Sequence, residues 1–128
     1  PNGSCIWLDG GHNPDAGIAL AHALEPYAPL HIVCGLLRNK DAMGFLRPFA
    51  HKISSFRAVP IPGHEHHDPK DLCHWVQSDL DIADAQPCGD IAAALRHIAD
   101  HGATGNVLIC GSLYLAGVVL AQNGEQPD

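Results

Sequence analysis

The stretch CIWLDGGHNPDAGIALAHAL, residues 5–24, contains the strand-to-helix transition that decides the fold. Its first four residues form an apolar run that predicts a buried strand, and the six that follow have the glycines, asparagine and proline typical of a tight loop. Asn13 is a suitable N-cap and Pro14 suits the first turn of a helix. A helix is therefore predicted over residues 14–24.

The same alternation of apolar runs and helix-length segments continues along the chain. Further strands are predicted over residues 30–34, 56–61, 81–83 and 106–110. Further helices are predicted over residues 41–51, 69–77, 90–101 and 112–120. Strands separated by helices imply right-handed crossovers and a mainly parallel sheet that is covered on both faces. The predicted fold class is α/β, a three-layer Rossmann-like domain.

Composition limits the classes of protein to consider. The 128 residues suffice for one domain, and 46% hydrophobic with 16% charged residues exclude disorder of the whole chain. Seven Lys and Arg against 14 Asp and Glu give a formal charge of −7, which argues against nucleic acid or an anionic membrane as a partner. Five cysteines without a CxxC pair indicate neither a zinc ribbon nor a disulfide scaffold. With no recognisable signal peptide, the cytoplasm is the expected compartment.

The loop after the first predicted strand carries the strongest chemical signal. Asp9 can accept two hydrogen bonds from a vicinal diol such as that of ribose, and His12 can donate to a phosphate or stack near a base. The exposed amides at the start of the following helix favour a negatively charged group. A tight turn with an asparagine cap and no ligand explains the same residues, so the residues alone leave both interpretations open.

Three segments resemble motifs of the folylpolyglutamate synthases, a family within the ATP-dependent Mur-type ligases. DGGHNP, residues 9–14, resembles the family's Asp-Gly-Ala-His-Asn-Pro signature, with Gly11 where alanine is usual. GLLRNKD, residues 35–41, resembles its Gly-x5-Asp segment, and VLICGSLYL, residues 107–115, resembles its closing strand, Gly-Ser and helix. The three are in register and span nearly the whole chain. Peptidoglycan-type Mur ligases usually carry tyrosine where this chain has Gly10, which favours the folate branch.

The resemblance implies a Mur ligase C-terminal domain over residues 1–121, followed by a polar tail over residues 122–128. The family uses ATP and Mg²⁺ to convert a carboxylate into an acyl phosphate, which the amine of L-glutamate then attacks. The implied acceptor is a folate or dihydropteroate, with folylpolyglutamate synthase and dihydrofolate synthase activities combined. The chain contains no GxxxxGK[ST] segment, so the family's N-terminal P-loop ATPase domain is expected upstream of Pro1 and the chain alone is expected to be inactive.

The resemblance also suggests roles for individual residues. Asp9 would hold the ATP ribose, His12 would lie near the nucleotide and the incoming glutamate as a catalytic residue, and Asn13 would shape the nucleotide-binding turn. The glutamate side of the cleft would be lined by Lys40, Asp41 and Ser112. An ammonium group, a hydroxyl and a helix N-terminus suit the two carboxylates of glutamate. Without the resemblance, these three residues indicate helix caps and a solvated lysine.

The segment HEHHD, residues 64–68, could supply ligands for zinc or nickel. It lies in a Pro/Gly-rich loop and no partner ligand is fixed by spacing, so an exposed loop is favoured and no metal site is predicted. In the family the corresponding stretch lies near the cleft, which makes His64 a candidate substrate contact. His74 and His97, on predicted helices, are expected to be exposed or capping. The alternatives are a peptidoglycan-type Mur ligase and a stand-alone nucleotide- or metal-binding module.

Overall fold

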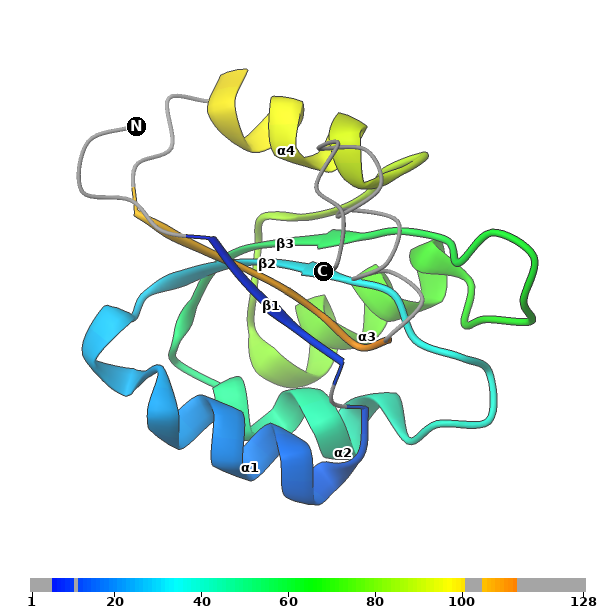
Figure 1. Cartoon of the computed structure of the whole chain (residues 1–128). Coiled ribbons are helices and arrows are strands. Elements are labelled where there is room, and N and C mark those ends of the chain that lie inside the picture. Colours follow the sequence, from blue (N-terminus) through cyan, green and yellow to red (C-terminus); the bar gives the residue numbers. More distant parts are fainter. Residues whose placement is uncertain (1–5, 11, 101–104, 113–128) are drawn as a thin grey trace, which may run out of the picture.

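The computed structural model describes residues 6–10, 12–100 and 105–112, which form a parallel five-stranded sheet with helices on both faces (Figure 1). The strands are β1 (Ile6–Asp9), β2 (Leu30–Cys34), β3 (Ile53–Ala58), β4 (Ala85–Pro87) and β5 (Asn106–Cys110). The helices are α1 (Pro14–Ala23), α2 (Ala42–Leu46), α3 (Pro69–Leu80) and α4 (Ile91–Asp100), with short 3₁₀ turns at Glu25–Tyr27 and Arg47–Phe49. The strand order is β1-β5-β2-β3-β4, which confirms the predicted three-layer α/β class.

Two apolar cores lie on opposite faces of the sheet. Helices α1, α2 and α3 pack on one face, where Phe45 and Leu72 are fully buried, and α4 packs on the other, where Ala94 is fully buried. Neighbouring residues of β2 supply both cores, Ile32 on the first face and Val33 on the second. A central parallel strand is covered on both sides, which explains why residues 30–34 are apolar throughout apart from one histidine.

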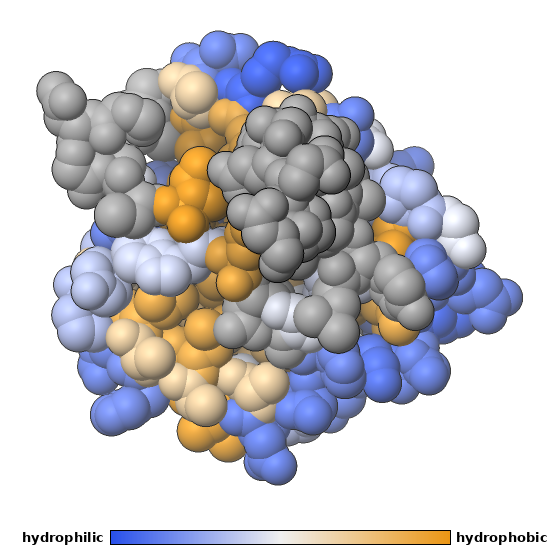
Figure 2. Space-filling view, in the orientation of Figure 1, coloured by the Kyte–Doolittle hydropathy of each residue, from blue (hydrophilic) through white to orange (hydrophobic). Residues whose placement is uncertain are grey.

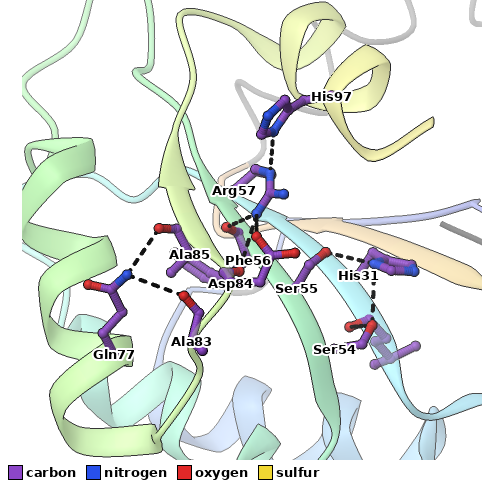
Figure 3. A network of polar contacts seen from close by, with 11 residues as sticks. His31, Ser54, Ser55, Phe56, Arg57, Gln77, Ala83, Asp84, Ala85 and His97 are labelled. Atoms are coloured by element: carbon purple, nitrogen blue, oxygen red, sulfur yellow. Dashed lines mark hydrogen bonds and ion pairs between the residues drawn. The ribbon is translucent and has the colours of Figure 1, made fainter. Parts of the chain in front are cut away.

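The third strand differs from its predicted bounds: β3 occupies Ile53–Ala58 rather than residues 56–61. Pro60 has no backbone N–H to donate to a neighbouring strand, and β3 ends before it. The strand begins earlier and includes Ser55, which is buried with its hydroxyl paired, and Arg57 further along the strand is buried as well. Ser55 Oγ lies 2.6 Å from His31 Nδ1, and Arg57 bonds to several groups around it (Figure 3).

Two further elements differ from their predicted bounds. The edge strand lies at Ala85–Pro87 rather than at residues 81–83, because Asp81 adopts a left-handed conformation (φ 57°) that ends α3. The second helix stops at Leu46 and continues only as a 3₁₀ turn. Pro48 explains this, since proline inside a helix lacks the N–H and clashes with the preceding turn.

Strand β1 forms one edge of the sheet, and apolar residues gather over β1 and α1 (Figure 2). The exposed large apolar side chains are Ile6, Leu8, Ile18 and Tyr27. Trp7 is half-buried, with its ring centroid 4.7 Å from that of Tyr27. Within the described chain, no helix has both the length and the apolarity to cross a membrane. The helix predicted beyond Ser112 and the tail over residues 122–128 lie outside the described residues.

Candidate functional site

The carboxyl ends of β1, β5 and β2 are neighbours in the sheet. Asp9 pairs with Cys110, and Cys110 pairs with Cys34 on the other side. Three segments leave the sheet at this edge: the β1–α1 turn (residues 10–13), the β2–α2 loop (residues 35–41) and the β5 exit (residues 111–112). In a parallel α/β sheet, ligands bind beyond the carboxyl ends of the strands. The described residues of the three motif segments therefore lie at the edge where a ligand is expected.

The β5 exit approaches the β2–α2 loop closely enough to require glycine. Gly111 has φ 105°, and a Cβ built on it would overlap the carbonyl oxygen of Gly35. The Gly35 amide donates to the Cys110 carbonyl oxygen at 3.3 Å, which joins the two segments. Ser112 follows directly and is buried, with 2% of its surface exposed. The residue predicted to line the glutamate side of the cleft therefore directly follows a segment that is fixed against the β2–α2 loop.

The β1–α1 turn places His12 before a capped helix. The Asn13 side chain accepts from the Ala16 amide at 2.8 Å, which confirms the predicted N-cap of α1. His12 is half-buried, and within the described residues its Nδ1 is the only buried side-chain nitrogen or oxygen without a hydrogen-bond partner. Buried polar atoms are nearly always paired, so an orphaned ring nitrogen marks an atom that a ligand can satisfy. The backbone of Asp9 ends β1, and its side chain lies outside the described part of the chain.

Helices α1 and α2 start side by side. Asp41 Oδ1 accepts from the Gly44 amide at 2.9 Å and so caps α2. A Cβ on Gly44 would overlap the Asp41 carboxylate and lie 2.8 Å from Pro14 Cγ, at the first position of α1. A Cβ on Gly17 would likewise overlap the Phe45 carbonyl oxygen. Glycines thus allow the two helices to approach closely, which brings the Asp41 cap beside the turn that carries His12.

The β2–α2 loop is supported by the histidine-rich loop that follows β3. Arg38 donates its amide to the Glu65 carbonyl oxygen at 3.2 Å, and the His67 amide donates to the Leu36 carbonyl oxygen at 2.9 Å. His67 Nε2 lies 2.7 Å from the carbonyl oxygen of Lys40. A hollow of about 300 Å³ opens beside this contact, and its lining residues are Lys40, Asp41, Ala42, Met43, His67, Trp75 and Asp79.

His64 is exposed and lies in a different hollow of about 310 Å³, beside Arg38 and Glu65. The structure therefore brings Lys40 and Asp41 together, but it does not bring His64 into their hollow. His66 Nδ1 lies 2.9 Å from the His64 carbonyl oxygen, so part of this loop bonds to itself. Across the residues with described positions, no group of three His, Cys, Asp or Glu side chains is arranged to hold a metal ion.

Sequence reasoning missed His67, which it treated only as one residue of an exposed loop. The ring is half-buried, contacts Trp75 edge-on at a centroid distance of 5.6 Å and bonds to Lys40. Its partner is a backbone carbonyl, which every residue has, so the sequence contains no signal for this pair. The close approach of α1 and α2 did have a signal, because Gly17 and Gly44 each stand inside a helix where glycine is unfavourable.

Residues 2–122 match the family model described as "Dihydrofolate synthetase, C-terminal domain". The chain belongs to this family. A folylpolyglutamate synthase from Lacticaseibacillus casei is 29% identical over 119 residues, covering 89% of this chain and 26% of that protein. The chain thus spans about a quarter of that relative. The predicted resemblance to folylpolyglutamate synthases is confirmed.

Two solved structures show the same fold. Mycobacterium tuberculosis folylpolyglutamate synthase, complexed with ADP and AMPPCP, has a TM-score of 0.81 at 21% identity, covering 96% of this chain and 30% of that one. The bifunctional folylpolyglutamate synthase/dihydrofolate synthase of Yersinia pestis, complexed with AMPPNP and Mn, has a TM-score of 0.73 at 24% identity, covering 93% of this chain and 28% of that one. At these identities the likeness establishes the α/β fold of the C-terminal domain.

Proposed function

We propose that this chain is the C-terminal domain of an ATP-dependent ligase that joins L-glutamate to a folate or dihydropteroate carboxylate. The observation that carries the proposal is the convergence of three family motifs at one edge of the sheet, in residues 9–14, 35–41 and 111–112. Family membership supports the folate branch over a peptidoglycan-type ligase. The parts of the ligase that bind ATP phosphates and Mg²⁺ would be supplied mainly by an N-terminal P-loop domain.

On the nucleotide side, the residues present suit the polar groups of ATP. Asp9 would accept hydrogen bonds from the ribose diol, and the orphaned Nδ1 of His12 would pair with a polar atom of the nucleotide or the incoming glutamate. The start of α1, capped by Asn13, favours a nearby negative charge. When bound, ATP would supply the phosphoryl group that activates the carboxylate. The role of this chain is to bind, to orient and to exclude water from the resulting acyl phosphate.

On the glutamate side, Lys40 and Asp41 line one hollow and Ser112 lies at the neighbouring β5 exit. The Lys40 ammonium group suits a glutamate carboxylate, and a positioned amine nitrogen would displace phosphate from the acyl carbon to form the amide. Asp41 uses one oxygen to cap α2 and is otherwise exposed. His64 stays a proposed substrate contact, reached from its separate hollow rather than through Lys40.

The test is ATP turnover by the complete protein encoded by the gene that contains this sequence. We expect hydrolysis or product formation only when L-glutamate and a folate or dihydropteroate are both present. Asp9→Ala should raise the KM for ATP and slow turnover, because a diol contact is lost. Asp100→Ala, at the exposed end of α4, is the matched control and should behave like the unsubstituted protein. ATP turnover that does not depend on glutamate would refute the proposal. Unchanged kinetics of Asp9→Ala would refute the role of Asp9 in binding the ribose.

A further inference from the structure

We infer that His67 is a positioning residue for glutamate binding, which it serves by fixing the peptide between Lys40 and Asp41. This inference rests on the proposed ligase function and adds a residue that the three motifs do not contain. His67 lies on the loop between β3 and α3, whereas Lys40 and Asp41 end the β2–α2 loop. A side-chain contact joins these segments, from His67 Nε2 to the Lys40 carbonyl oxygen at 2.7 Å.

The chemistry of this contact fixes which atom holds the proton. A carbonyl oxygen only accepts, so His67 Nε2 must carry the hydrogen that it donates to Lys40. Both the neutral tautomer protonated at Nε2 and the imidazolium provide that hydrogen. His67 therefore acts here as a hydrogen-bond donor and not as a general base.

His67 is held through both its backbone and its ring. The His67 amide donates to the Leu36 carbonyl oxygen at 2.9 Å, and the ring lies edge-on to Trp75 of α3 at a centroid distance of 5.6 Å. The fixed ring in turn orients the Lys40 carbonyl group, which belongs to the same peptide unit as the Asp41 amide. Restraining that peptide sets the direction in which both side chains leave the backbone.

The restraint matters because the two side chains line the same hollow of about 300 Å³ as the His67 ring. The charged residues that line this hollow with His67 are Lys40 and Asp41 on the β2–α2 loop and Asp79 on α3. A bound carboxylate needs the ammonium group placed within a fraction of an ångström, so loosening the peptide should weaken glutamate binding more than it slows chemistry. His67 would then act on KM without touching the substrate.

Three substitutions separate the hydrogen bond from the ring. His67→Phe keeps an aromatic ring beside Trp75 and removes the donor. His67→Gln places an amide N–H near the position of Nε2, and His67→Asn carries the same amide on a side chain one methylene shorter. His74→Phe is the matched control, because His74 is exposed on α3. Asparagine also guards against misfolding of the phenylalanine variant, since it is small and polar.

The measurement is steady-state kinetics of the complete protein, with the KM for L-glutamate, the KM for ATP, kcat and the pH profile of kcat. Losing one part-buried hydrogen bond should raise the glutamate KM roughly three- to ten-fold in His67→Phe and His67→Asn, with the ATP KM unchanged. His67→Gln should restore the glutamate KM, and all variants should keep the pH profile of the unsubstituted protein.

Two results would overturn the inference alone, in a protein that does show glutamate-dependent turnover. The first is a glutamate KM that stays constant in both His67→Phe and His67→Asn. The second is a fall in kcat that His67→Gln fails to restore, together with a lost limb of the pH profile, which would make His67 a proton-transfer residue. A complete protein without glutamate-dependent turnover would instead refute the proposed function, and the inference with it.

Discussion

Two groups of polar residues in this domain use their hydrogen bonds in opposite ways. Around Arg57, on β3, the chain satisfies a fully buried guanidinium (Figure 3). Its Nε donates to His97 Nδ1 at 2.8 Å, one terminal nitrogen donates to the Phe56 carbonyl oxygen at 3.0 Å, and the same nitrogen lies 2.9 Å from an Asp84 carboxylate oxygen. This interior network joins β3, α4 and the segment before β4.

At the carboxyl edge of the sheet, hydrogen bonds shape the backbone instead. Asn13 and Asp41 cap helices, and His67 holds a carbonyl group. The Nδ1 atom of His12 has no partner, and Lys40 lines a hollow. The difference indicates that polar residues of the interior serve stability, whereas those of the edge fix the backbone so that other groups can meet a ligand.

The largest loss of stability should come from replacing the buried Arg57. Arg57→Met keeps most of the side-chain volume but deletes every donor, and it should lower the free energy of unfolding by about 3 kcal/mol. The value lies at the low end for a buried pair because the Asp84 side chain is 47% exposed and water can solvate it once it is released. Urea unfolding measures the change, with Arg47→Met, at an exposed arginine, as the control. Equal losses in the two variants would show that the network does not stabilise the domain.

The next largest loss of stability is expected where the β5 exit contacts the backbone of the β2–α2 loop. Gly111 and Gly63 both have positive φ, 105° and 80°, but only Gly111 faces a backbone carbonyl group, that of Gly35. Gly63→Ala should cost about 1 kcal/mol from backbone strain alone, whereas Gly111→Ala should cost about 3 kcal/mol because overlap is added. Denaturant unfolding of the two variants measures both costs, and their difference is the free energy of the overlap at residue 111. Similar costs would mean that the two segments do not need their close approach.

The sequence was most informative where one physical effect dominates. Strands β2 and β5 were predicted to the residue because their apolar runs are covered on both faces of the sheet. The sheet edge at which the motif segments lie could also be predicted, since they follow the carboxyl ends of parallel strands, where ligands of such sheets bind. The Asn13 cap followed from its place before Pro14.

Sequence reasoning failed where polar residues are buried by partners far along the chain. The predicted third strand left out Ser55, whose partner His31 lies 24 residues away, and it gave no partner for Arg57, which bonds to His97 40 residues away. His97, expected on an exposed or capping position, accepts from the buried guanidinium instead. Such pairs depend on tertiary structure, and neither periodicity nor composition indicates them.

The pH dependence of stability tests the interior of the domain. Cys73 of α3 is buried against the sheet, and this burial raises the pKa of its thiol from 9.0 to about 11, partly offset by a hydrogen bond with the Ala58 backbone. Because the folded state holds its proton more tightly, the stabilisation is complete below pH 9 and is lost as pH rises toward 11. The loss should reach roughly 2 kcal/mol.

Urea unfolding of the unsubstituted chain and of Cys73→Ala, at several values between pH 8 and pH 11 with a reductant present, measures this loss. The two proteins share every other titratable group, so the difference between the two curves reports the Cys73 thiol together with its interaction with Cys88. The stability difference should shrink steadily above pH 9. Parallel curves would show that the space between α3 and the sheet tolerates a thiolate.

The smallest change in stability is expected at Asp41. The same residue also gives the most specific test of the carboxyl edge of the sheet. Asp41→Ala removes the cap of α2 and should cost about 1 kcal/mol, whereas Asp41→Asn keeps an oxygen for the Gly44 amide and should cost almost nothing. The same two changes at Asp90, whose carboxylate accepts from the Ala93 amide at 2.7 Å, provide a matched cap on α4.

The substitutions at Asp41 and Asp90 should differ in their effect on glutamate binding by the complete protein. At Asp90, neither substitution should alter the glutamate KM, because that residue only caps the start of α4. At Asp41, Asn should raise the glutamate KM even though stability is kept, since the charge beside Lys40 is lost from a shared hollow. If Asp41→Asn left the glutamate KM unchanged, Asp41 would be a helix cap alone, and the glutamate side of the cleft would depend on Lys40 and Ser112.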